Sequence, residues 1–335
     1  MSVSTTDKID ESVLFLQKTL KNGAERPSRS LWYDAWVRLL RNKAAVGGAV
    51  VILLFIGTAI FAPQIAPHNP LELNSGKGFL PPVWVERSAT NKTGVAEFLL
   101  GTDSLGRDVL SRIIYGARVS MVVGFVPTTI IILVGVTIGL IAGYRGGSID
   151  NLLMRLTDAV IALPLLPLLI ILAAVDFSKL GLGALVQSDS ASLYRIILII
   201  ALVGWTAVAR LVRGATLSLL GRDFVRAALA LGARAPRIML VHILPNAVSP
   251  IIVATTLAVG NVILFESVLS FLGLGIQPPV PSWGNMLTNA QELIGTAPLL
   301  AVWPGLLILL TVASCNLLGD ALQHALDPRA RLMKR

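Results

Sequence analysis

The stretch Val225–Asn246, VRAALALGARAPRIMLVHILPN, reads as one short helix, a glycine, and a second helical run that ends in Leu-Pro. Over Arg222–Leu231 the apolar side chains share one arc of a helix opposite the charged ones, as in an amphipathic surface helix; they are Phe224, Val225, Ala228, Leu229 and Leu231. Gly232 can take a positive φ and end this helix, and Pro236 suits the first turn of the next one. The stretch therefore predicts a helix–turn–helix, which Leu244-Pro245 separates from the next apolar segment.

Long apolar segments lie on both sides of this stretch. The chain is 54% hydrophobic and only 14% charged, whereas soluble chains are about 25% charged. Six segments approach the length of about 20 residues that a helix needs to cross a bilayer: 44–63, 119–143, 152–174, 193–212, 246–270 and 298–319. Backbone groups in lipid must be paired internally, which favours helices over open strands. The sequence therefore predicts an all-α membrane protein with about six transmembrane helices.

The distribution of basic residues predicts the orientation. With an even number of spans, both termini share one side of the membrane with the segments 144–155 and 210–242. Together with 1–43 and 320–335, these segments hold 20 of the 28 Lys and Arg residues. The positive-inside rule places them in the cytoplasm. This topology also explains the net charge of +9, so the charge gives no indication of nucleic-acid binding.

The predicted organisation has five parts. They are a cytoplasmic N-terminal tail 1–43, a first span 44–63, an extracytoplasmic loop 64–118, a five-helix core 119–319 that includes the cytoplasmic loop 214–245, and a cytoplasmic C-terminal tail 320–335. The end of the N-terminal tail has Leu and Trp residues on one helical face and predicts an amphipathic helix. Such a helix either lies in the membrane interface or packs on neighbouring protein. The outer segment 70–98 suggests no role.

The sequence lacks the motifs of enzymes and metal sites. No Gly-x-x-x-x-Gly-Lys-Ser/Thr phosphate loop and no His-Glu-x-x-His motif occurs. The three histidines (His68, His242 and His324) are scattered, and the single cysteine, Cys315, lies in the sixth predicted span. We therefore predict no catalytic residue, no metal site and no cofactor, and the chain is not expected to be an enzyme.

Two acidic residues lie within predicted spans. A carboxylate at the centre of a bilayer costs about 2.5–3.5 kcal/mol on insertion scales, so Glu266 is expected to face protein or water. It either lines a translocation path or bonds a neighbouring helix. Asp158 lies three residues after Arg155, a spacing that predicts a local ion pair on one helix.

An amphipathic helix–turn–helix at the cytoplasmic mouth has two plausible uses. It can lie on lipid, or it can dock as an anchored helix in a groove of a cytosolic partner. Physical chemistry alone leaves both open.

The stretch resembles the coupling loop of ABC importer permeases, whose pattern is Glu-Ala-Ala, three residues, Gly, and later Ile-x-Leu-Pro. The matching residues here are Arg226-Ala227-Ala228, Gly232 and Leu244-Pro245, with Arg in place of Glu. Four further segments resemble the second-permease branch of the peptide/nickel group, the last of them with an oligopeptide-permease character: LGTDSLGRDVLSRIIYGARVS (100–120), FESVLSFLGLGIQPPVPSWGNML (265–287), NLLGDALQHALDPR (316–329) and RSLWYDAWVRLLRNKAAV (29–46).

The resemblance implies a type I importer permease in a bacterial or archaeal plasma membrane. It implies a pore shared with a sister permease, two ATP-binding subunits below it, and an extracytoplasmic binding protein that delivers peptides. The implied ATPase-coupling residues are Arg222, Phe224, Arg226, Ala227, Ala228, Gly232, Leu244 and Pro245, and Glu266 is a candidate for the path. Nickel and glutathione are the other substrates within the group. A secondary transporter or channel that needs no ATPase partner is the alternative class.

Overall fold

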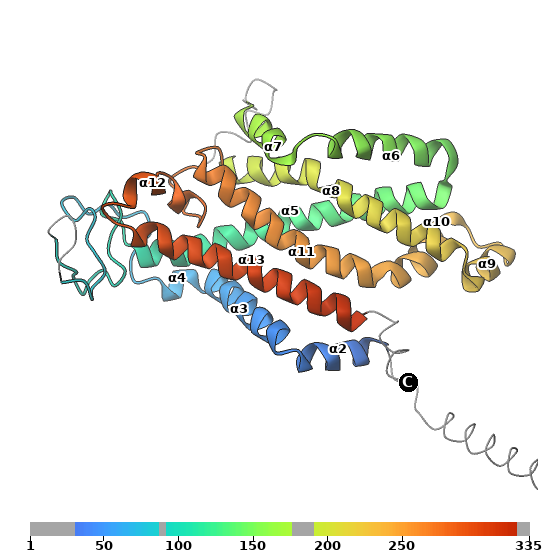
Figure 1. Cartoon of the computed structure of the whole chain (residues 1–335), viewed down its shortest axis with the longest axis horizontal. Helices are drawn as coiled ribbons and strands as arrows, with labels where there is room; N and C mark the ends of the chain where they lie inside the picture. The colour runs from blue at the N-terminus through green and yellow to red at the C-terminus, as the bar shows by residue number, and fades with distance from the viewer. Residues whose placement is uncertain (1–30, 87–91, 176–190, 327–335) are drawn as a thin grey trace, which may run out of the picture.

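The computed structural model describes residues 31–86, 92–175 and 191–326, and within them the regular structure is helical. The long helices run along the long axis of the molecule (Figure 1). They are α3 (Lys43–Ile60), α5 (Val109–Arg145), α8 (Ala191–Leu220), α11 (Leu244–Phe271) and α13 (Leu299–Leu326), accompanied by α2 (Leu31–Arg41), α4 (Ala62–Ile65), α6 (Gly147–Ile161), α7 (Leu165–Ala174), α9 (Asp223–Ala230), α10 (Ala235–Arg237), α12 (Ala290–Leu293), a π-helix (Ile238–Ile243) and a 3₁₀ turn (Asn285–Leu287).

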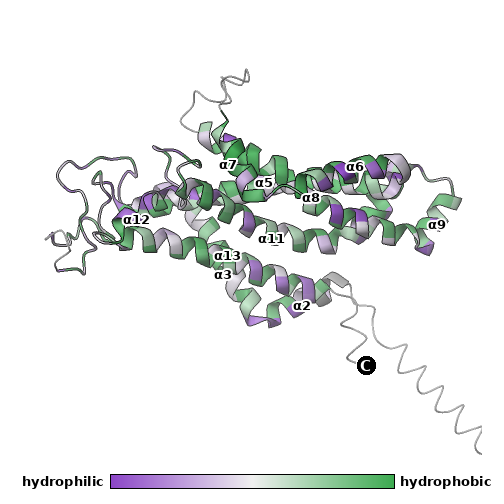
Figure 2. Ribbon diagram, turned by 45° about the horizontal axis from the view of Figure 1, so that its top comes forward, coloured by the Kyte–Doolittle hydropathy of each residue, from purple (hydrophilic) through white to green (hydrophobic). Residues whose placement is uncertain are grey.

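The all-helical fold predicted from the sequence is confirmed. Among the described residues, five helices are long and apolar enough to cross a membrane, and a sixth crossing is present if the bent pair α6–α7 counts as one span. Figure 2 shows that the bundle is mainly hydrophobic, while hydrophilic residues are frequent in the irregular loops beside α12. The start of α3 and the end of α13 both lie toward the end of the bundle that carries α9, opposite α12 (Figure 1).

The predicted third span, 152–174, is not one straight helix. Its two halves, α6 and α7, meet at an angle of 84° across a short break. Pro164 is the residue that caps α7, and Pro167 follows within its first turn. A proline disfavours helical geometry in the residue before it and removes a backbone donor, so two prolines this close end α6 and redirect the chain.

Small residues bring α5 and α8 into close contact. Gly135, Gly139 and Gly143 recur every four residues on one face of α5. A Cβ at Gly139 would lie 2.6 Å from the backbone oxygen of Ala209, and one at Gly143 would lie 2.7 Å from the Cβ of Thr216. Helices in membranes often associate through such small-residue faces because van der Waals contact replaces the hydrophobic drive present in water.

Two ion pairs hold α6 against α8. The Arg213 guanidinium donates to both carboxylate oxygens of Asp150, at 2.5 and 2.6 Å, and Arg210 pairs with Asp158. The predicted pairing of Asp158 with Arg155 on its own helix is therefore wrong. The carboxylate instead meets an arginine 52 positions further along the chain, because α8 packs alongside α6.

The predicted amphipathic helix before the first span is present as α2. It packs beside α13 and α3, with Ala35 buried and Tyr33, Trp36 and Leu40 exposed. The side chains of Leu31 and Trp32, which the prediction placed on the apolar face, lie outside the described residues, as do residues 1–30 and 327–335 of the predicted tails.

Candidate functional site

The first half of the stretch Val225–Asn246 belongs to α9, which lies at the extreme end of the bundle (Figure 1). Val225 is fully buried and Ala228 is 8% exposed. Val225 packs in the same hydrophobic cluster as Ile238 and Ile243 of the following helical segment. Burying side chains of this size contributes about 1.5–3 kcal/mol each. Helix α9 is therefore fixed to the core of the chain.

A Schellman motif ends α9 at Gly232. Gly232 has a φ of +80°, which confirms the prediction of a positive φ. Its N–H donates to the carbonyl of Leu229 at 2.9 Å, and the N–H of Ala233 donates to the carbonyl of Ala228 at 3.0 Å. These two bonds satisfy carbonyls that the helix end would leave unpaired, and the left-handed residue between them is normally glycine.

The second half of the stretch continues into α11 without the predicted interruption at Leu244-Pro245. Pro236 lies in the first turn of α10, as predicted, and a π-helix then connects Ile238 to Ile243. The N–H of Leu244 donates to the carbonyl of Met239, five residues earlier. This wider turn accommodates Pro245, which has no N–H and lies in the first turn of α11. The second helix of the helix–turn–helix is thus a continuous extension of α11.

The predicted apolar arc of α9 is divided between two faces. Val225 and Ala228 point into the chain, whereas Phe224, Leu229 and Leu231 are 42%, 45% and 88% exposed. The chain's own core therefore covers part of this arc, and the exposed part is what remains available for docking. The exposed charged residues of the same segment are mostly basic: Arg222, Asp223, Arg226, Arg234 and Arg237.

Of the predicted coupling residues, the structure brings together most but not all. Arg222, Phe224, Arg226 and Ala227 are exposed on α9 or its cap, and Gly232 is exposed at the turn. Leu244 and Pro245 belong to the start of α11, on the far side of the π-helix. The apolar tip with a basic rim suits a partner surface that is apolar in the centre and acidic around it.

Glu266 lies at the other end of α11, fully buried, as expected of a residue that faces protein. Its Oε1 accepts hydrogen bonds from the hydroxyls of Ser270, at 2.7 Å, and Ser282, at 3.1 Å. A Cβ at Gly284 would lie 2.8 Å from the same oxygen. Glu266 thus bonds the loop that follows α11, which supports the alternative of bonding neighbouring segments.

This loop is also held by Trp283, whose importance the sequence did not indicate. Trp283 is 1% exposed; its Nε1 donates to the carbonyl of Ile113 at 3.0 Å. Its ring meets Phe55 edge-on, at 5.2 Å between centroids. The loop after α11 is thereby joined to both α5 and α3.

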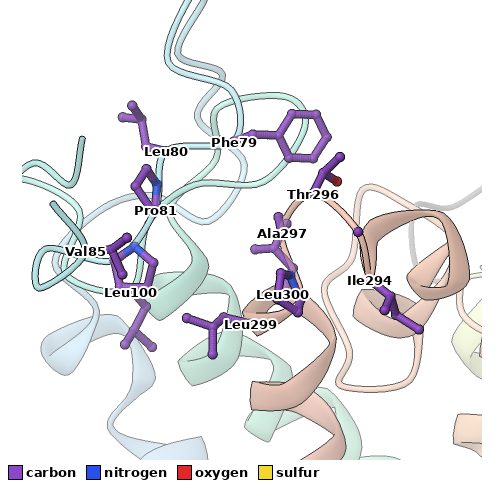
Figure 3. A pocket seen from close by; sticks show the side chains of 13 residues that line it. Phe79, Leu80, Pro81, Val85, Leu100, Ile294, Thr296, Ala297, Leu299 and Leu300 are labelled. Carbon is purple, nitrogen blue, oxygen red and sulfur yellow. The ribbon is translucent and has the colours of Figure 1, made fainter. Parts of the chain in front are cut away.

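The described part of the outer segment 70–98 folds against the residues before α13. A cavity of about 360 Å³ lies between them, lined on one side by Phe79, Leu80 and Val85 and on the other by Ile294, Ala297 and Leu300 (Figure 3). Trp84 contacts Trp303 of α13 edge-on. Residues 87–91 of this segment lie outside the described residues.

Next to this cavity, the segment 100–112 forms a compact turn before α5. The Oδ1 of Asp103 accepts from the backbone N–H groups of Leu105 and Arg107, and its Oδ2 pairs with the side chains of Arg107 and Arg112. Asp108 caps α5 by accepting from the N–H of Ser111. In residues 31–86, 92–175 and 191–326 there is no group of three or more His, Cys, Asp or Glu side chains that could hold a metal ion.

Comparisons with known proteins place these features in a family. Residues 135–332 match the binding-protein-dependent transport system inner membrane component, and residues 30–82 match the N-terminal transmembrane domain of oligopeptide transport permease C. A di/tripeptide transport system permease of Pseudomonas aeruginosa is 42% identical over 89% of this chain and 92% of its own length. An oligopeptide transport permease of Bacillus subtilis is 36% identical over 91% and 92%, and a glutathione transport permease of Pectobacterium atrosepticum is 36% identical over 92% and 94%.

Proposed function

Because the chain belongs to the family of binding-protein-dependent transport system inner membrane components, we propose that it forms the pore of an ATP-driven peptide importer together with a sister permease. It is a permease subunit of the group whose relatives are named for dipeptide, oligopeptide and glutathione transport. Two ATP-binding subunits bind below the pore, and an extracytoplasmic binding protein delivers the peptide. ATP hydrolysis takes place in the partner subunits.

The observation that carries this proposal is the attachment of α9 to α11. Val225, Ile238 and Ile243 are each fully buried in one cluster, while Phe224 and Leu231 extend outward from the same element. A force applied to these exposed side chains is transmitted to a transmembrane helix of 28 residues. Packed helices move as rigid bodies when domains rearrange, so the element suits the transfer of motion from an ATPase to the pore.

Co-purification tests the proposed assembly. The chain, expressed with the sister permease and ATP-binding subunits encoded beside it, should be recovered with both in mild detergent. Its recovery as a single-chain transporter that takes up substrate without these subunits would favour a secondary carrier instead.

We propose that α9 faces the cytoplasm and the segment beside α12 faces outward. The bias of basic residues supports this orientation. Single cysteines at Glu72 and Glu292, both exposed beside the outer loops, should react with a membrane-impermeant thiol reagent in intact cells. A cysteine at Ser218, exposed near the end of α8, should react only after lysis. Labelling of Ser218→Cys in intact cells would invert the orientation and separate α9 from the ATPase side.

Arg226 is proposed to pair with an acidic residue on the rim of the ATPase groove. It is exposed on α9, and a guanidinium presents a planar fork that matches a carboxylate. Since an exposed pair is worth about 0.2–1 kcal/mol, Arg226→Ala should reduce the rate of peptide uptake by less than about fivefold. Arg226→Glu should reduce it further, because it adds repulsion to the loss.

The charge reversal supplies the control for this pairing. An acid-to-arginine change on the ATPase should rescue Arg226→Glu but not Arg226→Ala. Equal uptake by the Ala and Glu variants in the assembled complex would mean that Arg226 only contributes to the basic charge of the cytoplasmic side.

A further inference from the structure

A second cavity lies within the membrane-spanning part of the chain, away from α9 and from the outer loops. It has a volume of about 480 Å³, is lined by α5, the α6–α7 pair, α8 and α11, and is open on one side. Sites for small molecules have volumes of about 300–1,000 Å³. Its walls are aliphatic, with side chains such as Ile131, Leu169 and Val203. The described lining residues include two polar side chains, Thr206 and Asn261.

These two polar side chains are in different situations. The hydroxyl of Thr206 donates to the carbonyl of Val203 in its own helix, at 3.3 Å, so its hydrogen-bonding need is met. Asn261 is exposed, and its side-chain amide has no hydrogen-bond partner among the described residues. Polar side chains in a membrane span face a bundle interior or a water-filled cavity, because lipid offers no partner. The amide of Asn261 therefore needs a partner from outside the described residues.

Asn261 points into the cavity by its position on α11. The residues Ala254, Leu257, Ala258 and Asn261 all line the cavity, and their spacing of three and four residues defines one face of the helix. Asn261 lies three residues past the midpoint of the predicted span 246–270, which corresponds to about 4.5 Å along the helix axis. The amide is thus close to the middle of the membrane.

The break between α6 and α7 opens onto the same cavity. Ile161, Leu163 and Leu165 from the two sides of the break line it. Leu163 is 50% exposed. Its carbonyl lacks the usual helical donor, because Pro167, four residues later, has no N–H. Irregular backbone at membrane depth is tolerated only where protein or a water-filled cavity covers it. In many secondary transporters, broken helices of this kind form substrate sites.

We propose that this cavity is a transient binding site for the transported peptide, in which the Asn261 amide binds the peptide's main chain. The inference rests on the proposed function. A primary amide offers a donor and an acceptor together, which match the C=O and N–H of one peptide group. The aliphatic walls can accommodate varied uncharged side chains without discriminating among them.

Thiol accessibility tests the position of the peptide. The complex of this chain, its sister permease and ATPases carries Asn261→Cys in a Cys315→Ala background and is reconstituted with the binding protein. A charged thiosulfonate reagent should label the cysteine, and saturating trialanine should slow the labelling at least about fivefold. The matched control is Leu53→Cys on α3, an apolar position 66% exposed, which should stay unlabelled. Absence of labelling at position 261 with or without ATP and vanadate, or labelling that trialanine does not slow, would overturn the proposal.

Transport kinetics test the hydrogen bond. Loss of one such bond corresponds to a factor of about ten, so Asn261→Leu should lower trialanine uptake about tenfold at low substrate concentration, and Asn261→Gln should restore most of it. Uptake by Asn261→Leu equal to that of wild type would overturn the proposed peptide-binding site. The proposed function is tested separately, by uptake through the wild-type complex. If the wild-type complex imports no peptide, the proposed function itself fails.

Discussion

The variant Gly232→Val is expected to assemble into the transporter complex but to import peptide at least about tenfold more slowly than wild type. Gly232 has a φ of +80°, and an added Cβ would meet no atom within 4 Å. Any effect must therefore come from backbone strain, which is about 1–2 kcal/mol for ordinary residues in this conformation and larger for β-branched ones. Relief of that strain would dissolve the Schellman motif and change the angle between α9 and α10. Initial uptake rates in proteoliposomes, together with subunit stoichiometry, measure the effect.

Two variants separate backbone strain from a general effect of valine near the tip. Asparagine tolerates a positive φ better than other residues, so Gly232→Asn should retain most of the uptake. Gly221 has open space around its Cα and no positive φ, so Gly221→Val should be close to wild type. Wild-type uptake by Gly232→Val would mean that the turn geometry has no part in coupling.

The variant Leu231→Glu is expected to weaken binding of the ATP-binding subunits by roughly 10- to 100-fold, from the 1.5–3 kcal/mol that burial of a leucine contributes. Leu231 is 88% exposed at the C-terminal end of α9, so its apolar side chain packs little against the rest of the chain. Together with Phe224 it forms the outermost apolar surface next to the turn. Titration of purified ATP-binding subunits onto the detergent-solubilised permease pair measures the change.

Leu231→Met conserves the volume and polarity of the side chain and is the control for this variant. It should bind the ATP-binding subunits within about threefold of wild type, because volume-conserving apolar exchanges cost little. The melting temperature of the permease pair should be the same for both variants, since neither change touches the core. Equal affinity of Leu231→Glu and wild type would show that the partner does not cover this surface.

The local features of the stretch Val225–Asn246 could be read from the sequence because short-range chemistry sets them. A glycine after an amphipathic run indicates a helix end, and Gly232 has the expected φ. Pro236 lies in the first turn of the second helix, as its fixed φ predicted. The length and apolarity of the spans predicted the all-helical fold for a similar reason, since the bilayer imposes both.

The features that could not be read depend on contacts between segments distant in the sequence. The sequence did not show which part of the α9 arc is buried, because the partners of Val225 (Ile238 and Ile243) belong to the helical segment after the turn. Asp158 pairs with Arg210 rather than with Arg155 of its own helix, because α6 and α8 lie side by side. Leu244-Pro245 was expected to interrupt the helix, but a π-helix just before it accommodates the missing N–H of Pro245. No local sequence pattern indicates this arrangement.

The sites inside the membrane were only partly visible in the sequence. Glu266 was noticeable as a charge in a span, and its two serine partners lie at and beyond the end of α11. Asn261 is uncharged and did not stand out. Its significance depends on a cavity that α5, the α6–α7 pair, α8 and α11 line together, which spacing along one helix does not indicate.

ATP-dependent peptide uptake by the reconstituted complex tests the proposed function most directly. Proteoliposomes containing this chain, its sister permease and the two ATP-binding subunits receive labelled peptide and the binding protein outside, with ATP trapped inside. We expect accumulation that requires ATP hydrolysis, the binding protein and all subunits, and that is insensitive to collapse of ion gradients. Accumulation that continues without ATP and depends on an imposed ion gradient would contradict an ATP-coupled permease and identify the chain as a self-sufficient carrier.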